Sequence, residues 1–319
     1  MQARSMAAGT PGASETTDRS RRTGAGRARL AALAMLVAVV ALASALVSAP
    51  ASGAAKPKPP GSGSYVALGD SFTAGPLIPI QRDDPAGCLR STNNYPSLVA
   101  PSLPTPEFRD ASCSGAETED MTSPQGVTPG PNPPQFDRLD RNTRVVTVGI
   151  GGNDIGFSEI VRNCFTLDPT GSPCQDRYVV GGQDEISQRI AATAPLVAGV
   201  IQGIHQRAPK AAVYVVGYPA VLPDVGNGCY PQMPVAYADV PYLRDKEKEL
   251  NSMLAAQAAT NGAVYVDTYT PSIGHDACQL PVIRWIEPVV PVSPAAPVHP
   301  NLQGMQGLAV VVRGAIVGG

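Results

Sequence analysis

Tyr65-Val66-Ala67-Leu68-Gly69-Asp70-Ser71-Phe72-Thr73-Ala74-Gly75 is the stretch that decides the fold. Its first four residues favour a β-strand, and small residues suited to a helix start follow Gly69-Asp70-Ser71. Open α/β sheets keep their active sites at the C-terminal ends of their strands, which is where this serine would lie. A serine alone is a weak nucleophile and needs a base, a group that orients the base, and donors for an oxyanion. The rest of the chain offers a candidate for each.

The first 55 of the 319 residues predict an export signal. Arginines at 21, 22, 27 and 29 precede an apolar run over residues 30–47, and small residues suited to signal peptidase lie near 51–55. This layout predicts a signal peptide over 1–55 with cleavage near 51–55. A retained membrane anchor is the alternative, because about 18 apolar residues can just span a bilayer.

The remaining chain suits one large exported domain. Residues 56–63 predict a flexible leader, and residues 64–319 are long enough for a single domain with a full core. The first 55 residues hold six arginines and two acidic residues, so the mature chain carries a net charge of −6. This acidic balance gives no reason to expect nucleic acid or an anionic membrane surface as a partner. We expect a secreted monomer without stable membrane anchoring after signal cleavage.

All six cysteines lie in the exported part of the chain. An even number of cysteines after an export signal predicts three disulfides, for which 15 pairings are possible. Spacing alone favours only one pair, Cys164 with Cys174, as a local staple. No Cys-x-x-Cys or Cys/His cluster has the spacing of a metal site, so we expect neither metal nor cofactor.

Strand and helix patterns alternate along the chain. Such alternation predicts an α/β protein with a parallel sheet and helices on both faces. Pro195 lies inside the longest helical pattern and predicts a kink or break there. The expected strands cover residues 107–112, 144–150, 211–217 and 263–267 in addition to the first, and the expected helices cover 95–103, 183–208, 242–259 and 303–316. Residues 76–94, 155–182 and 220–240 are expected to be loops that wall the site.

Two further strand ends carry residues that can donate hydrogen bonds to a bound oxygen. Gly115 follows the expected strand 107–112 and offers a backbone N–H, although a turn glycine is the simpler reading. Asn153 follows Gly151-Gly152 after the most apolar strand, and its amide can donate two hydrogen bonds. An Asx turn is the alternative for Asn153. The two glycines favour a functional role, because they let backbone and ligand approach closely.

The base must come from three histidines. His205 lies beside Gln206 and Arg207 on an expected helix, and we expect it to be a surface residue. His275 lies in a loop near Cys278, where a structural role is the simpler reading. His299 lies between Pro297-Val298 and Pro300, just before the closing helix, and the prolines restrict its backbone. We therefore choose His299.

These segments, taken together, resemble a known family. Gly69-Asp70-Ser71, Gly115, Gly151-Gly152-Asn153-Asp154 and His299-Pro300-Asn301 match in order the four sequence blocks of the SGNH, or GDSL-type, hydrolases. The chain is most similar to secreted actinobacterial, streptomycete-like esterases and lipases, which share the segment 208–219 and six cysteines. The resemblance covers nearly all of the mature chain.

The resemblance implies both a fold and roles for residues. The fold would be a flavodoxin-like three-layer α/β/α sandwich with a five-stranded parallel sheet. Ser71 would attack an ester carbonyl and His299 would take its proton. The oxyanion would be bound by the Ser71 N–H, the Gly115 N–H and the Asn153 amide. The disulfides would be Cys88–Cys113, Cys164–Cys174 and Cys229–Cys278.

One position departs from the family pattern. Most members carry an aspartate three residues before the base, whereas this chain has Ala296. We expect the backbone carbonyl of Ala296 to orient the imidazole, because a carbonyl accepts a hydrogen bond as a carboxylate does and selects the same tautomer. In a serine protease, the wrong tautomer costs about 10⁴ in rate. A distant acid, Asp276 or Glu287, is the alternative.

The expected function is therefore that of a secreted serine esterase or lipase, which acts on small-molecule or lipid esters through an acyl-enzyme. A carbohydrate O-acetylesterase and a phospholipase A or acyltransferase are alternatives on the same fold. A non-catalytic glycan-binding protein is the alternative from another class. The chain has no Gly-x-Ser-x-Gly elbow, P-loop or Gly-x-Gly-x-x-Gly fingerprint, so an α/β-hydrolase of the usual type or a nucleotide enzyme is not indicated.

Overall fold

The computed structural model describes residues 63–318. The expected signal peptide over 1–55 and the leader up to residue 62 lie outside the described residues. Among the described helices, none is long and apolar enough to cross a membrane.

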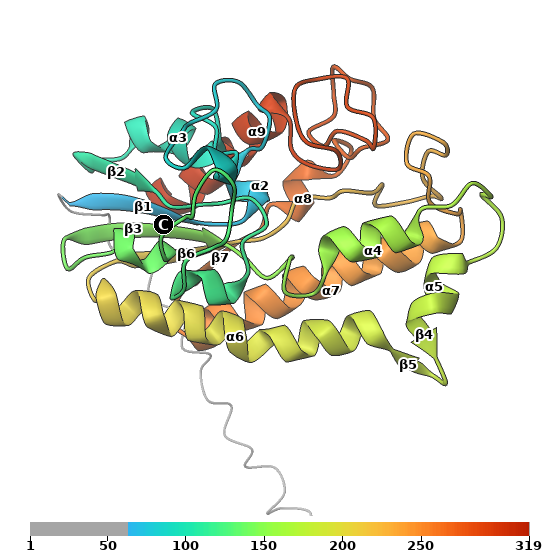
Figure 1. Cartoon of the computed structure of the whole chain (residues 1–319), viewed down its shortest axis with the longest axis horizontal. Helices are drawn as coiled ribbons and strands as arrows, with labels where there is room; N and C mark the ends of the chain where they lie inside the picture. The colour runs from blue at the N-terminus through green and yellow to red at the C-terminus, as the bar shows by residue number, and fades with distance from the viewer. Residues whose placement is uncertain (1–62, 319) are drawn as a thin grey trace, which may run out of the picture. The chain divides into compact units, whose positions relative to one another are not determined.

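A parallel sheet of five strands forms the centre of the domain (Figure 1). The order across the sheet is β2-β1-β3-β6-β7, and every neighbouring pair is parallel. This arrangement confirms the predicted three-layer α/β fold. The strands are β1 (Ser64–Gly69), β2 (Glu107–Asp110), β3 (Thr143–Gly149), β6 (Ala212–Val216) and β7 (Val264–Val266).

The two faces of the sheet belong to two separate apolar clusters. Tyr65 and Ala67 of β1 pack with helices α3 (Tyr95–Val99) and α9 (Leu302–Val317). Val66 and Leu68 belong to the cluster that also contains residues of α6 (Glu185–Arg207) and α7 (Asp239–Thr260). Successive strand side chains point to opposite faces, so a strand buried on both sides must be apolar throughout. Figure 1 shows these helix pairs on opposite sides of the sheet.

Helix α6 excludes a break, one of the two alternatives predicted from Pro195. The helix runs unbroken from Glu185 to Arg207 with Pro195 inside it, so the predicted break is wrong. Proline removes one hydrogen bond to the carbonyl four residues earlier, here that of Ala191. Both Ala191 and Pro195 lie on the exposed side of α6, where water can hydrogen-bond the freed carbonyl. The buried side of the helix keeps its contacts with the core.

Residues 155–182 were expected to be a loop but contain two helices. They are α4 (Phe157–Cys164) and α5 (Pro173–Tyr178), and the strands β4 (Val179–Val180) and β5 (Gln183–Asp184) form a small antiparallel hairpin after them. Phe157, Ile160, Val161 and Cys164 recur at helical spacing, a signal that was present in the sequence but short. This region lies at the end of α6 and α7 away from β2 and β1 (Figure 1).

Short elements and disulfides complete the described part. The structure joins Cys88 to Cys113, Cys164 to Cys174 and Cys229 to Cys278, in the order that the family resemblance implies. The second disulfide links α4 to α5. The short helices are α2 (Ser71–Ala74), α8 (Tyr269–Ser272) and the 3-10 turns η1 (Ala86–Cys88), η2 (Ala100–Ser102), η3 (Thr118–Met121) and η4 (Gln135–Arg138).

Candidate active site

Ser71 lies at the C-terminal edge of the sheet, two residues after Gly69, the last residue of strand β1. Gly69 has φ +149°, and a Cβ atom there would lie 2.7 Å from the Gly149 carbonyl oxygen, which no side chain can do. The Gln135 side-chain amide binds both backbone groups of Gly69, accepting from its N–H at 2.8 Å and donating to its carbonyl at 2.9 Å. Ser71 then begins helix α2 with only 8% of its surface exposed.

Ser71 and His299 meet across 228 residues of sequence. The Ser71 Oγ lies 2.7 Å from His299 Nε2, and His299 Nδ1 lies 2.7 Å from the Pro297 carbonyl oxygen. The Phe72 and Phe157 rings lie against the imidazole, with ring centroids 4.9 and 6.4 Å away. Because a carbonyl only accepts, Nδ1 carries the proton and Nε2 accepts from the serine hydroxyl.

The carbonyl that orients His299 is not the predicted one. Pro297, rather than Ala296, contacts Nδ1, so the prediction was wrong by one residue. Ala296 instead donates its N–H to the Pro76 carbonyl at 3.0 Å. Val298 between Pro297 and His299 has φ +60°, a left-handed conformation that is unusual for a β-branched residue. This turn reverses the chain locally, which sets the carbonyl of Pro297 against the imidazole.

The two acids proposed as alternative orienters have other partners. Asp276 accepts from the Cys278 N–H and the Gln279 amide. Glu287 is fully buried and pairs with Arg284, with an Oε2–Nη2 distance of 2.6 Å. Neither carboxylate has a hydrogen bond to His299.

Glu287 nevertheless holds the His299 segment through backbone hydrogen bonds. Its N–H donates to the His299 carbonyl, and its carbonyl accepts from the Val298 N–H, both at 3.0 Å. Burial alone would raise the pKa of Glu287, but hydrogen bonds from Arg284, Asn301 and two backbone N–H groups lower it to about 2. Asn301 also caps helix α9 by accepting from the Gly304 N–H at 2.9 Å. The segment around His299 is thus bound to a buried ion pair on one side and a helix start on the other.

The environment of His299 suits a base. Desolvation lowers the pKa of the imidazole below its ordinary 6.5, while the hydrogen bond to the Pro297 carbonyl acts in the opposite direction. The net lowering of the pKa keeps the ring neutral at pH 7, so that it can accept a proton. The other two histidines do not approach Ser71. His275 stacks on Trp285 with ring centroids 4.7 Å apart, and His205 Nε2 contacts the Asn261 carbonyl.

Three groups around Ser71 can bind an oxyanion. Among the described residues, the backbone N–H groups of Ser71 and Gly115 have no hydrogen-bond partner. Gly115 is exposed and has φ +80°, a conformation that glycine adopts without strain. Asn153 donates to the Ala116 carbonyl at 2.9 Å, which fixes its amide and leaves its second N–H free. Strands β1 and β3 end in register at Gly69 and Gly149, which brings Ser71 and Asn153 to one edge.

A buried hydrogen-bond network lies behind Ser71, and the part that Tyr218 plays in it was not predicted. The Tyr218 hydroxyl donates to Asp70 Oδ2 at 2.6 Å and accepts from the Gly152 N–H at 2.8 Å, while Asp70 Oδ1 accepts from the Phe72 N–H. Burial raises the pKa of Asp70 to about 7, against the opposing effect of these hydrogen bonds. The network joins the start of helix α2 to the glycines before Asn153. Tyr218 follows strand β6, so only its strand-end position could have suggested it.

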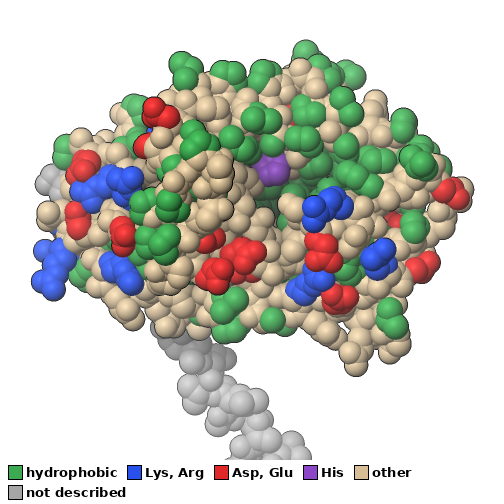
Figure 2. Space-filling view, in the orientation of Figure 1, with side chains coloured by type: hydrophobic (Ala, Val, Ile, Leu, Met, Phe, Trp, Pro, Cys, Tyr) green, Lys and Arg blue, Asp and Glu red, His purple; other side chains and the backbone are tan. Residues whose placement is uncertain are grey.

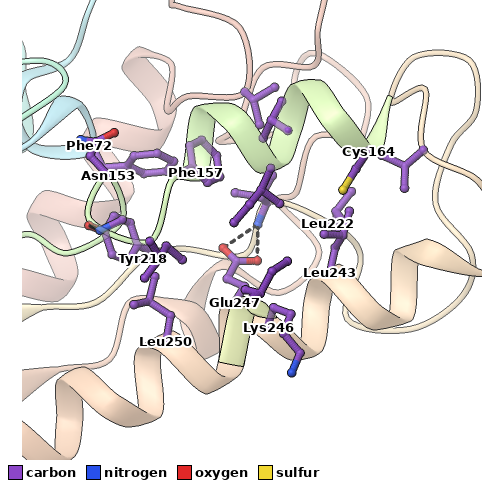
Figure 3. Close-up of a pocket in the computed structure, with 18 of the residues that line it drawn as sticks. Phe72, Asn153, Phe157, Cys164, Tyr218, Leu222, Leu243, Lys246, Glu247 and Leu250 are labelled. Atoms are coloured by element: carbon purple, nitrogen blue, oxygen red, sulfur yellow. Dashed lines mark hydrogen bonds between the residues drawn. The ribbon is translucent and has the colours of Figure 1, made fainter. Parts of the chain in front are cut away.

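An apolar pocket opens beside Ser71 and Asn153. Figure 3 shows Phe72 and Asn153 at one end and Leu222, Leu243 and Cys164 toward the other. Helix α4 supplies one wall and helix α7 another, while segments after β6 close the pocket between them. Hydrophobic side chains also border the hollow on the face seen in Figure 2, where one histidine is visible. The arrangement can hold an apolar chain next to the serine hydroxyl.

Within residues 63–318, no three His, Cys, Asp or Glu side chains are grouped so as to hold a metal ion.

A serine and a histidine lie in hydrogen-bond contact at the C-terminal edge of a parallel α/β sheet, beside free N–H donors and an apolar pocket. This arrangement is that of a serine hydrolase of the three-layer α/β class. Comparison with known proteins gives the family. The model of the GDSL-like lipase/acylhydrolase family matches residues 67–306, and the chain belongs to this family. It is a carboxylic ester hydrolase.

Individual relatives agree with this assignment. The chain is 41% identical to Lipase 2 of Streptomyces coelicolor over 237 residues, which cover 71% of this chain and 76% of that protein. The solved structure of phospholipase A1 from Streptomyces albidoflavus superposes with a TM-score of 0.67 and 25% identity, covering 81% of this chain and 99% of that one. The extracellular lipase of Streptomyces rimosus gives a TM-score of 0.66 and 28% identity, covering 79% and 99%.

Proposed function

We propose that Ser71 and His299 carry out ester hydrolysis through an acyl-enzyme. His299 Nε2 takes the hydroxyl proton as the Ser71 oxygen attacks the ester carbonyl carbon, and it then gives this proton to the leaving alcohol. Water, deprotonated by the same nitrogen, releases the acyl group and restores Ser71. The observation that carries the proposal is the 2.7 Å contact between Ser71 Oγ and an imidazole whose other nitrogen faces a carbonyl.

We assign oxyanion binding to the Ser71 N–H, the Gly115 N–H and the Asn153 amide. In the tetrahedral intermediate these donors would face the former carbonyl oxygen, and each such donor is worth roughly 10²-fold in rate. His299 would be stabilised as imidazolium by the Pro297 carbonyl dipole rather than by a negative charge. The acyl chain would occupy the apolar pocket between α4 and α7.

Replacing Ser71 tests this mechanism. Ser71→Ala is expected to lower kcat for p-nitrophenyl octanoate by roughly 10⁴-fold or more, because the nucleophile is lost. Ser252→Ala, at an exposed serine of helix α7 that bonds only the Lys248 carbonyl, is the matched control and should keep full activity. Undiminished turnover in Ser71→Ala would refute the proposal.

Hydrolysis of phospholipid acyl esters is a second candidate. The structural likeness to a phospholipase A1 and the apolar pocket both favour it over an O-acetylesterase, since an acetyl group would leave the pocket unfilled. Release of fatty acid from didecanoyl phosphatidylcholine would support this activity. Turnover of acetate esters alone, with no release from either octanoate or phospholipid esters, would contradict both.

We also propose that the protein acts outside the cell as a monomeric domain over residues 64–319, after removal of residues 1–55. Three disulfides support this location, because such bonds persist in oxidising compartments. N-terminal sequencing of protein recovered from the culture medium should begin near residues 52–56. Recovery of the uncleaved chain in the membrane fraction would favour the retained anchor instead.

A further inference from the structure

One carboxyl group lies in the wall of the apolar pocket. Glu247 on helix α7 extends into the pocket, where its two oxygens each lie 3.2 Å from the Val221 N–H (Figure 3). Leu243, Leu250 and Leu222 line the pocket beside it. A carboxyl group in such surroundings is costly unless its hydrogen-bonding groups are used.

The other polar side chains around the pocket already have partners. Asp70 and Tyr218 bind each other. The Lys246 ammonium binds Asp184 at 2.8 Å and Glu249 at 2.7 Å, and its side chain points away from Glu247 in Figure 3. Glu247 differs from them, because the Val221 N–H is the one hydrogen-bond partner of its carboxyl group among the described residues and occupies only part of it.

Glu247 has no ion-pair partner among the described residues. Burial raises the pKa of its carboxyl to about 8, against the Val221 hydrogen bond and the charge of Lys248, with Asp276 adding to the rise. Lys248 is itself bound to Asp224 at 2.5 Å. The Tyr265 and Tyr269 hydroxyls, which also lie near Glu247, have raised pKa values and stay neutral. At pH 7 the carboxyl group is therefore neutral, with one O–H donor and one spare acceptor.

We propose that Glu247 is a specificity-determining residue that selects esters whose acyl chain carries a hydroxyl group. The inference rests on the proposed function, in which the acyl chain fills this pocket. A hydroxyl both donates and accepts, so it complements a neutral carboxyl group fully. An unsubstituted chain would leave the O–H of Glu247 buried without a partner, and sites built to bind a hydroxyl reject analogues that lack it.

A purely structural role for Glu247 makes a different prediction. If the side chain served only to satisfy the buried Val221 N–H, the pocket would prefer unsubstituted chains at every position, as any apolar pocket does. The ratio of kcat/KM for a hydroxylated ester to kcat/KM for the unsubstituted ester therefore distinguishes the two roles. This ratio does not depend on how much of a variant is folded.

The experiment compares p-nitrophenyl decanoate with its hydroxydecanoate isomers at pH 6.5, with the hydroxyl moved carbon by carbon along the chain. The wild type is expected to prefer one isomer over decanoate by roughly 10-fold. Glu247→Leu should abolish this preference, and Glu247→Gln should keep most of it because an amide also donates and accepts. Glu249→Gln, two residues along α7 with its side chain on Lys246, is the matched control and should behave as the wild type.

A pH profile gives a second readout. Above about pH 8 the wild type should lose kcat/KM for decanoate as Glu247 ionises, whereas Glu247→Gln should not. Preference for decanoate over every isomer, or an unchanged preference in Glu247→Leu, would overturn the inference. These results differ from failure of the proposed function, in which no ester is turned over and a fluorophosphonate does not label Ser71.

Discussion

A buried carboxyl group lies behind each member of the Ser71–His299 pair, and the pKa values of these two groups are shifted in opposite directions. Asp70 behind Ser71 accepts from the Tyr218 hydroxyl and the Phe72 N–H, and its pKa is raised to about 7. Glu287 behind His299 pairs with Arg284, and its pKa is lowered to about 2. Ser71 directly follows a regular strand, and hydrogen bonds without an ion pair hold it in place. The histidine lies on irregular chain, and a buried ion pair holds that chain in place.

The two carboxyl groups therefore have opposite effects on stability as pH changes. The folded-state pKa of Asp70 exceeds its unfolded value of 3.8, so its contribution to the free energy of unfolding falls as pH rises from about 4 to 7. The folded-state pKa of Glu287 is below its unfolded value of 4.5, so its contribution is complete above about pH 4.5 and is lost as pH falls toward 2.

The largest expected effect comes from removing the base. His299→Gln should lower kcat/KM by roughly 10⁴-fold, because Ser71 loses its proton acceptor. The melting temperature should change little, since the ring is only partly buried. His205→Gln on helix α6 is the control. A loss of less than about tenfold would place the base elsewhere.

Breaking the ion pair behind His299 should mainly affect stability. Glu287→Gln leaves Arg284 buried without a counter-charge, and the free energy of unfolding should fall by about 3 kcal/mol at pH 7. The difference from wild type should shrink as pH falls from 4.5 to 2, which urea unfolding at several pH values would measure. The exposed Glu119→Gln should be neutral. A difference independent of pH would contradict the role assigned to the charge of Glu287.

On the serine side, Asn153→Ala should reduce kcat by roughly 10²-fold with little change in KM, because the amide would act only on the developing oxyanion. Asn163→Ala on helix α4 removes an amide that binds Glu159 and Tyr178 and should leave kcat within about twofold. Equal kcat in the two variants would remove Asn153 from the oxyanion site.

The smallest of these effects is expected at Tyr218. Tyr218→Phe keeps the ring against Phe72 but removes the hydroxyl that accepts from the Gly152 N–H and donates to Asp70 Oδ2. The free energy of unfolding should fall by about 1–3 kcal/mol, measured by urea unfolding. The exposed Tyr237→Phe should stay within about 0.5 kcal/mol of wild type. No difference between the two tyrosines would mean that the network behind Ser71 contributes nothing to stability.

The same contrast explains what could be predicted from the sequence. Ser71 and Asn153 follow apolar strands, and the C-terminal ends of parallel strands lie at the same edge of the sheet. His299 was predicted from flanking prolines and a family pattern. The carbonyl that orients it was missed by one residue, because the left-handed φ of Val298 depends on contacts with Glu287 that no local pattern records. The network of Asp70 and Tyr218 joins residues 148 apart in sequence and was likewise not predictable.

The pH dependence of fluorophosphonate labelling, read by peptide mass spectrometry, tests the pairing of Ser71 with a carbonyl-oriented His299 most directly. The adduct should form only on the peptide that contains Ser71. Its rate should rise with pH to a plateau with a midpoint below 6.5, since desolvation lowers the pKa of His299. An adduct on another residue, or a midpoint above 6.5 as a carboxylate partner would produce, would contradict the account.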